Sequence, residues 1–63
     1  MTNDELRRFI VARIDECGGD LMSVVNDEEE LADFALGRLF DETQTDITDE
    51  QHKIVLDVCS SYM

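Results

Sequence analysis

Alternate positions from Asp41 to Asp49 offer oxygen atoms at the spacing of a calcium-binding loop, from the side chains of Asp41, Thr43, Thr45 and Asp49 and from the backbone at Ile47. Such a loop needs glycine at its sixth position and glutamate at its twelfth, and these positions here hold Asp46 and His52. We therefore expect no calcium site in this stretch. No other spacing of Cys, His, Asp or Glu matches a metal site, so the sequence predicts no metal and no cofactor.

His52 is the only histidine and the only candidate for a catalytic base. A base of this kind needs an activated nucleophile and an orienting acid within reach, and no spacing in the chain indicates either. The serines lack the glycines of a nucleophile elbow, and there is no glycine-rich phosphate loop. The sequence therefore predicts that the chain is not an enzyme, and that His52 is half-buried or lies beside a helix cap.

The two cysteines, Cys17 and Cys59, belong to no Cys-x-x-Cys pair and to no zinc-ligand spacing. Each falls on the apolar stripe of an expected helix, where a free cysteine commonly packs as a small hydrophobic side chain. We expect two core thiols in a reducing compartment, and the alternative is a single disulfide.

The composition is strongly acidic, with 16 acidic and five basic residues and a net charge of −11. The only adjacent basic residues are Arg7 and Arg8, so the chain has no phosphate-binding patch and we expect no direct binding to nucleic acid. A surface of this charge attracts proteins that have a basic channel. Because 43% of the residues are hydrophobic and fall at helical spacing, we expect a folded domain and not a disordered acidic tail.

The length of 63 residues predicts one small helical domain over residues 1–63. A domain of this size buries only about 60% of its unfolded surface, so a partner or a homodimer could add stability. No apolar run is long enough for a membrane span, and the first residues lack the pattern of a signal peptide. We expect a soluble, cytoplasmic protein without a membrane partner.

A first helix is expected to begin near Asn3, because Thr2 and Glu5 form a capping box, and to end at Gly18-Gly19. Its apolar stripe consists of Leu6, Phe9, Ile10, Ile14 and Cys17. Arg13 points into this stripe. Either its stem lies on apolar surface while its head pairs with an acid of the same fold, or it is a binding anchor in a groove.

A short helical turn is expected within 20–26, followed by a central helix that Asn26 or Asp27 caps. Apolar residues cover most of that helix, so it must be packed from two sides; they are Leu31, Ala32, Phe34, Ala35, Leu36, Leu39 and Phe40. Glu30, Asp33 and Gly37 form its exposed strip. Gly37 marks either a close approach of another backbone or an exposed imperfection.

A polar linker is expected over 41–46, before a last helix with Thr48 as cap, Gln51 as its box partner and Ile47 at the staple position. The apolar face of this helix consists of Ile54, Val55, Val58, Cys59 and Tyr62, flanked by Leu56 and Met63. Its apolar end either closes the core or forms a contact patch. The predicted fold is all-α: a small bundle of three main helices plus one short helical turn.

The charge and the fold together predict a small inhibitor or regulator that occupies a basic, nucleic-acid-binding groove of a partner protein. In size and charge the chain resembles the small acidic proteins of phages and mobile elements that mimic DNA, including some anti-CRISPR proteins. The expected contact residues are the acids on and beside the exposed strip: Glu29, Glu30, Asp33, Asp41, Glu42, Asp46, Asp49 and Glu50.

The alternative is a structural or dimerising helical module whose acidity reflects a solvated or halophilic surface. Such a module would associate through an apolar face that includes Leu56 or Tyr62. A halophilic coat would require concentrated salt for folding.

Overall fold

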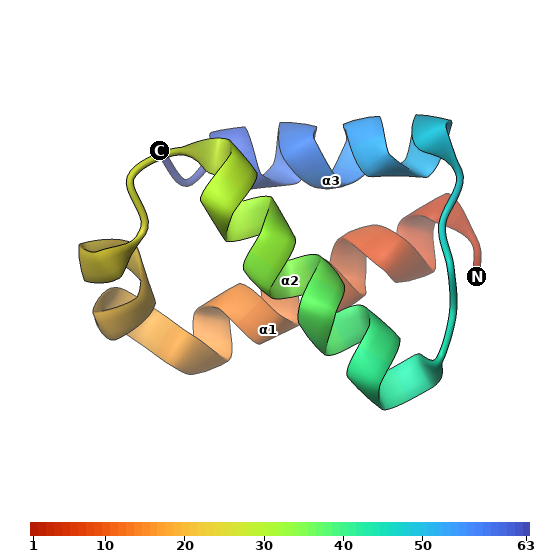
Figure 1. Ribbon diagram of the computed structural model, residues 1–63, viewed down its shortest axis with the longest axis horizontal. Coiled ribbons are helices and arrows are strands. Elements are labelled where there is room, and N and C mark those ends of the chain that lie inside the picture. The colour runs from red at the N-terminus through yellow and green to blue at the C-terminus, as the bar shows by residue number, and fades with distance from the viewer.

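A computed structural model describes all 63 residues and contains three helices and no strand (Figure 1). They are α1 (Asn3–Val24), α2 (Glu28–Thr43) and α3 (Asp49–Ser60). Helices α1 and α3 run in the same general direction, and α2 crosses both obliquely (Figure 1). The molecule measures 29 × 20 × 16 Å. The predicted all-α bundle is confirmed, and none of the helices is both long enough and apolar enough to cross a membrane.

The starts of α1 and α3 are fixed by the two predicted capping boxes. The Glu5 amide donates to Thr2 Oγ1 over 3.1 Å, and the Thr2 amide donates back to Glu5 Oε1 over 3.0 Å. The same exchange joins Gln51 and Thr48, with distances of 3.1 and 3.3 Å. Each box satisfies two backbone amides that the first helical turn leaves without a partner.

Helix α1 changes direction at Gly18, as the glycine pair predicts. Gly18 has φ of 61° and ψ of −150°, a backbone conformation that is almost restricted to glycine. It differs from the left-handed helical conformation expected at a helix end, because its ψ is extended. The residues after it form the predicted short helical turn, which continues to Val24 in a new direction (Figure 1).

Asp27 caps α2, so the second of the two candidate caps is the one used. Its Oδ1 accepts from the Glu30 amide over 2.9 Å. The Glu30 carboxylate then reaches back to Asn26, accepting from its amide at 3.3 Å and from its Nδ2 at 3.2 Å.

The end of α2 lies later in the chain than the sequence predicts. Asp41 and Glu42 belong to its last turn, and the polar linker begins at Gln44, whose φ of 57° ends the helix. No glycine or proline lies between Phe40 and Gln44 to end the helix earlier. Thr43 Oγ1 also donates to the Leu39 carbonyl over 2.8 Å, so polar side chains here stay helical. The prediction of a linker over 41–46 is therefore wrong at its start.

The core contains nine residues, each at most 2% exposed, from all three helices: Leu6, Ile10, Ile14, Leu31, Ala32, Ala35, Leu39, Val55 and Cys59. Helix α2 contacts both α1 and α3, as its wide apolar surface predicts. Phe40 is the exception, because its side chain remains 51% exposed. It lies seven residues after Asp33, a spacing that puts both on the outer side of α2.

Arg13 is held inside the fold, as the first of its two interpretations predicts. Its Nη1 lies 2.8 Å from Glu16 Oε2 and 3.7 Å from Glu42 Oε1, so one guanidinium links α1 to α2. Its Cζ lies 4.9 Å from the centre of the Phe9 ring. Nη1 and the face of the guanidinium are therefore occupied by side chains of this chain, whereas Nε is buried without a hydrogen-bond partner.

The C-terminal residues close one end of the core, and of the apolar ones only Met63 is exposed. Tyr62 is half-buried, and its hydroxyl donates to Asp15 Oδ1 over 3.3 Å. Met63 is 55% exposed. The two cysteines are free thiols, and Cys59 is fully buried whereas Cys17 is half-buried. His52 is exposed and lies beside the cap of α3, where its amide donates to the Thr48 carbonyl over 2.9 Å, so the second of its two expected positions is the observed one.

Substitution by alanine is expected to change stability in opposite directions at Gly37 and at Gly18. A Cβ at Gly37 would meet no atom within 4 Å, so the glycine is an exposed imperfection and not a point of close approach. We expect Gly37→Ala to raise the free energy of unfolding by about 1 kcal/mol, because alanine has the higher helix propensity. We expect Gly18→Ala to lower it, because the positive φ strains any side chain.

Urea denaturation followed by circular dichroism measures both changes. A loss of stability in Gly37→Ala would contradict the absence of neighbouring atoms around Gly37. A gain of stability in Gly18→Ala would contradict the kink.

Candidate functional site

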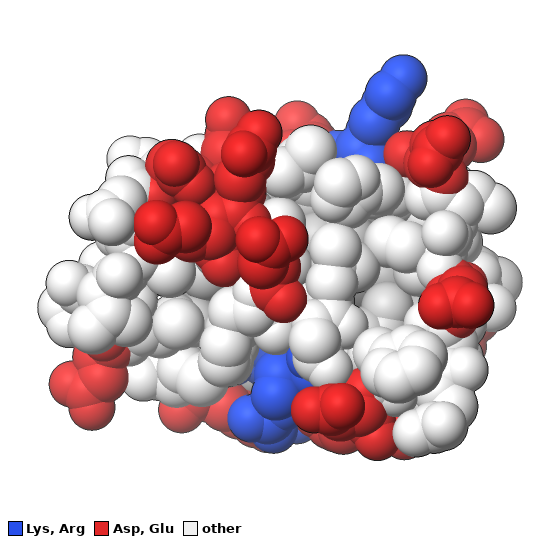
Figure 2. Space-filling view, viewed as in Figure 1, with Lys and Arg blue, Asp and Glu red and all other residues white.

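All eight acids predicted to contact a partner are exposed, but they do not form one continuous strip. Figure 2 shows one large group of acidic side chains over the end of α2 that lies at the upper left in Figure 1, and smaller separate groups elsewhere on this face. Along α2, Glu29 and Asp41 lie about 18 Å apart at 1.5 Å per residue. The predicted residues therefore occupy two ends of α2, the α2–α3 connection and the start of α3.

Two of the eight acids serve the fold. The Glu30 carboxylate is bonded to Asn26, as described above, and so orders the entry into α2. Glu42 accepts from Arg38 Nε over 3.2 Å and also pairs with Arg13. The charge of Glu42 is partly neutralised by two arginines, and the oxygens of Glu30 accept from the neutral amides of Asn26, so neither is a free contact.

The other six acids make no side-chain hydrogen bond and no ion pair; they are Glu29, Asp33, Asp41, Asp46, Asp49 and Glu50. Glu29, Asp49 and Glu50 lie in first turns of helices, where a negative charge is favourable. Asp41 lies in the last turn of α2, where the helix dipole opposes it. Asp33 and Asp46 gain nothing from a helix end. We call these six residues the unpaired acids.

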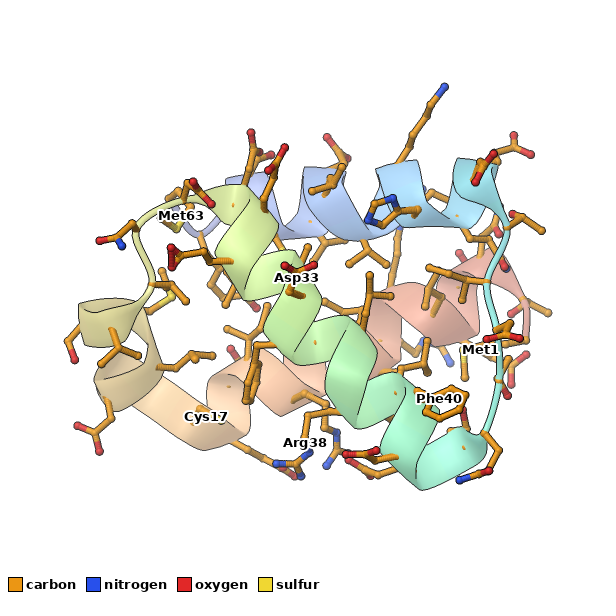
Figure 3. All side chains as sticks on the ribbon, viewed as in Figure 1. Met1, Cys17, Asp33, Arg38, Phe40 and Met63 are labelled. Carbon is orange, nitrogen blue, oxygen red and sulfur yellow. The ribbon has the colours of Figure 1, made fainter.

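A cleft between α2 and α3 brings two of the unpaired acids together with residues that the site prediction did not include. Its lining consists of Glu29 and Asp33 from α2, and His52 and Leu56 from α3. The residues of each pair are four apart, so both lie on one side of their helix. Figure 3 shows Asp33 on the viewer's side of α2. The cleft has a volume of about 220 Å³ and opens to solvent.

Sequence reasoning separated these four residues because it treated each helix alone. His52 and Leu56 share the four-residue spacing of Glu29 and Asp33, which is a signal that they face the same way. The sequence holds no signal for which side of α3 meets α2. Only the packing of the two helices creates the cleft.

The chemistry of this site is the binding of positively charged or hydrogen-bond-donating groups. Two carboxylates and an imidazole offer acceptors, and Leu56 offers one apolar contact. No group of three or more His, Cys, Asp or Glu residues is arranged to hold a metal ion.

Burial suppresses the reactivity of the Cys59 thiol. Desolvation in the core is the main cause and the nearby charge of Glu28 the lesser one, and together they raise its pKa from 9.0 to about 11. The thiolate is the reactive form of cysteine, so Cys59 is inert at neutral pH. Burial likewise raises the pKa of Tyr62, with smaller contributions from Asp15.

Comparisons with known proteins add no relative: no family model matches the chain, and neither the curated proteins nor the solved structures contain a significant match.

Because Cys17 and Cys59 differ in burial, we expect them to react at two distinct rates with a thiol reagent such as 5,5′-dithiobis(2-nitrobenzoate). The half-buried Cys17 reacts first. Cys59 reacts at least about 100-fold more slowly at pH 8, because raising a thiol pKa from 9.0 to about 11 lowers its thiolate fraction by that factor.

Absorbance at 412 nm follows both reactions, and Cys17→Ser removes the fast phase. Two equal rates, or loss of the slow phase in Cys17→Ser, would contradict the burial of Cys59.

Proposed function

We propose that this chain is a small acidic inhibitor or regulator that docks the face formed by α2 and the start of α3 into a basic, nucleic-acid-binding groove of a partner protein. The observation that carries this proposal is that six unpaired acids lie on α2, the α2–α3 connection and the start of α3; Asp20, Glu28 and Asp57 also lack a side-chain partner and were not among the predicted contacts. None of the six forms an ion pair within the chain, and three of them have no favourable interaction with a helix dipole. A partner with a basic groove supplies the counter-charge that the fold lacks.

The charge density of the molecule suits a nucleic-acid mimic. A duplex as long as the 29 Å molecule carries roughly 17 phosphate charges at one per 1.7 Å. The chain carries a net −11 over the same length. Its rigid helices hold these charges in place, so little ordering entropy is lost on binding.

The proposal includes a cellular setting. We infer that the protein acts in the cytoplasm, where it meets a nucleic-acid-binding partner. We also infer that it is encoded by a phage or mobile element and blocks a host defence protein, as anti-CRISPR proteins do. The mechanism is competitive: the acids occupy the groove, and nucleic acid is excluded from it. No catalytic step is involved.

The dimerising alternative has less support. Leu56 and Tyr62, which would form its contact face, are half-buried against the core of the same chain. The exposed large hydrophobic side chains are spread over both termini and two helices: Met1, Val11, Val24, Phe40 and Met63. Single exposed side chains of this kind are normal on a monomer.

The proposal predicts that the protein releases nucleic-acid-binding proteins from DNA-cellulose. A cell extract is loaded at low salt, and the released proteins are measured as the chain is added. We expect Asp33→Asn, Asp41→Asn and Asp46→Asn together to raise the concentration needed by at least about tenfold, equivalent to 1.4 kcal/mol. Added salt should also raise the concentration of the chain that is needed, because it screens the contacts between the acids and the basic groove.

The matched control neutralises three acids outside the proposed face: Asp4→Asn, Asp20→Asn and Asp57→Asn together. It changes the net charge by the same amount and keeps the unpaired acids. Equal loss of release in both variants, or no release by the unmodified chain from extracts of any candidate host, would overturn the proposal.

A further inference from the structure

The cleft between α2 and α3 is the one cavity of the molecule, and its lining mixes charge, an aromatic ring and an apolar side chain. We propose that it receives an arginine side chain of the partner. This inference rests on the proposed function and names the group that the partner inserts. The cleft is then the central contact of the acidic face.

The size of the cleft favours a single side chain. Sites for small-molecule ligands have volumes of roughly 300–1,000 Å³, and this cleft has about 220 Å³ and is open. A metal ion is excluded by the absence of a suitable group of ligands. One long side chain, entering from solvent, matches the space.

The charge of the cleft favours a cation. Glu29 and Asp33 stand one helical turn apart and have no partner in the chain. None of the five basic residues lines the cleft. Two carboxylates on one wall therefore have four oxygens available for donors from outside.

Arginine fits this lining better than lysine. Its guanidinium presents five donors in a planar fork, which matches two neighbouring carboxylates, whereas the ammonium of lysine is a compact and more strongly hydrated charge. The planar group also stacks on an aromatic ring, here the imidazole of His52. The aliphatic stem of arginine can lie along Leu56.

Phe40 extends the same face and supports contact with a partner. It is an exposed aromatic side chain on the outer side of α2, and Figure 3 shows it on the viewer's side with Asp33. Seven residues separate it from Asp33, which is about 10 Å along the helix axis. Exposed aromatic residues next to a binding cleft are typical of protein–protein contacts.

The test uses ethylguanidinium as the probe for arginine, ethylammonium for lysine and ethylurea as the uncharged control. Amide chemical shifts of the full chain are followed by ¹H–¹⁵N NMR at constant ionic strength. We expect saturable shifts centred on Glu29, Asp33, His52 and Leu56. We expect ethylguanidinium to bind at least about threefold more tightly than ethylammonium, and ethylurea to cause no shifts.

Paired variants separate the cleft from general electrostatics. Glu29→Gln with Asp33→Asn should weaken ethylguanidinium binding at least about tenfold, because both charge-assisted contacts are lost. Asp20→Asn with Asp57→Asn removes the same charge elsewhere and should change it less than about twofold. Circular dichroism checks that each variant keeps its helices.

Three results would overturn the cleft assignment: shifts spread over all acidic residues, equal or tighter binding of ethylammonium, or equal effects of the two paired variants. This test needs no partner protein. Its failure therefore leaves the DNA-cellulose result standing, and failure of release from DNA-cellulose leaves the probe result standing.

Discussion

The fold depends on a core of nine residues that must hold together a chain with a net charge of −11. Self-repulsion among the acids opposes compaction, and a domain of this size has little stability to oppose it. Two of the five basic residues counter this repulsion at a contact between helices. Arg13 and Arg38 both meet Glu42, so α1 and α2 are joined at the point where the acidic end of α2 would otherwise be least stable.

Some acids have partners within the fold, whereas the six unpaired acids, together with Asp20, Glu28 and Asp57, have none. Glu5, Asp27 and Glu30 satisfy backbone amides at helix starts, and Asp15 accepts from the Tyr62 hydroxyl. The six unpaired acids have no such partner, and Asp41 even opposes the dipole of its own helix. These acids repel one another and form no hydrogen bond or ion pair within the chain. Binding to another molecule therefore explains them better than a role in the fold does.

The sequence predicts those parts of the fold that local chemistry determines. Both capping boxes, the glycine kink and the three apolar faces follow from side chains within a few residues of one another, and all are present. The end of α2 was misplaced because polar residues fit a loop and a last helical turn equally well. Phe40 counted among the apolar residues of α2, but it lies on the outer side of the helix, and a list of apolar residues does not show which side the neighbouring helices leave open.

The candidate site was predictable only in part, for the same reason. The sequence identifies exposed acids, but it cannot distinguish Glu30 and Glu42, which find partners in the fold, from Glu29 and Asp33, which do not. Two of the residues that line the cleft, Glu29 and His52, lie more than 20 positions apart in the chain, and only the packing of α2 against α3 brings them near each other.

The central claim is that the unpaired acids do not serve the fold. The most direct measurement is the free energy of unfolding of the variant with Asp33→Asn, Asp41→Asn and Asp46→Asn, determined by urea denaturation beside the unmodified chain. We expect it to be more stable by about 1 kcal/mol, because repulsion is relieved and the dipole of α2 is no longer opposed. A variant less stable than the unmodified chain would contradict the account, because these acids would then be part of what holds the fold together.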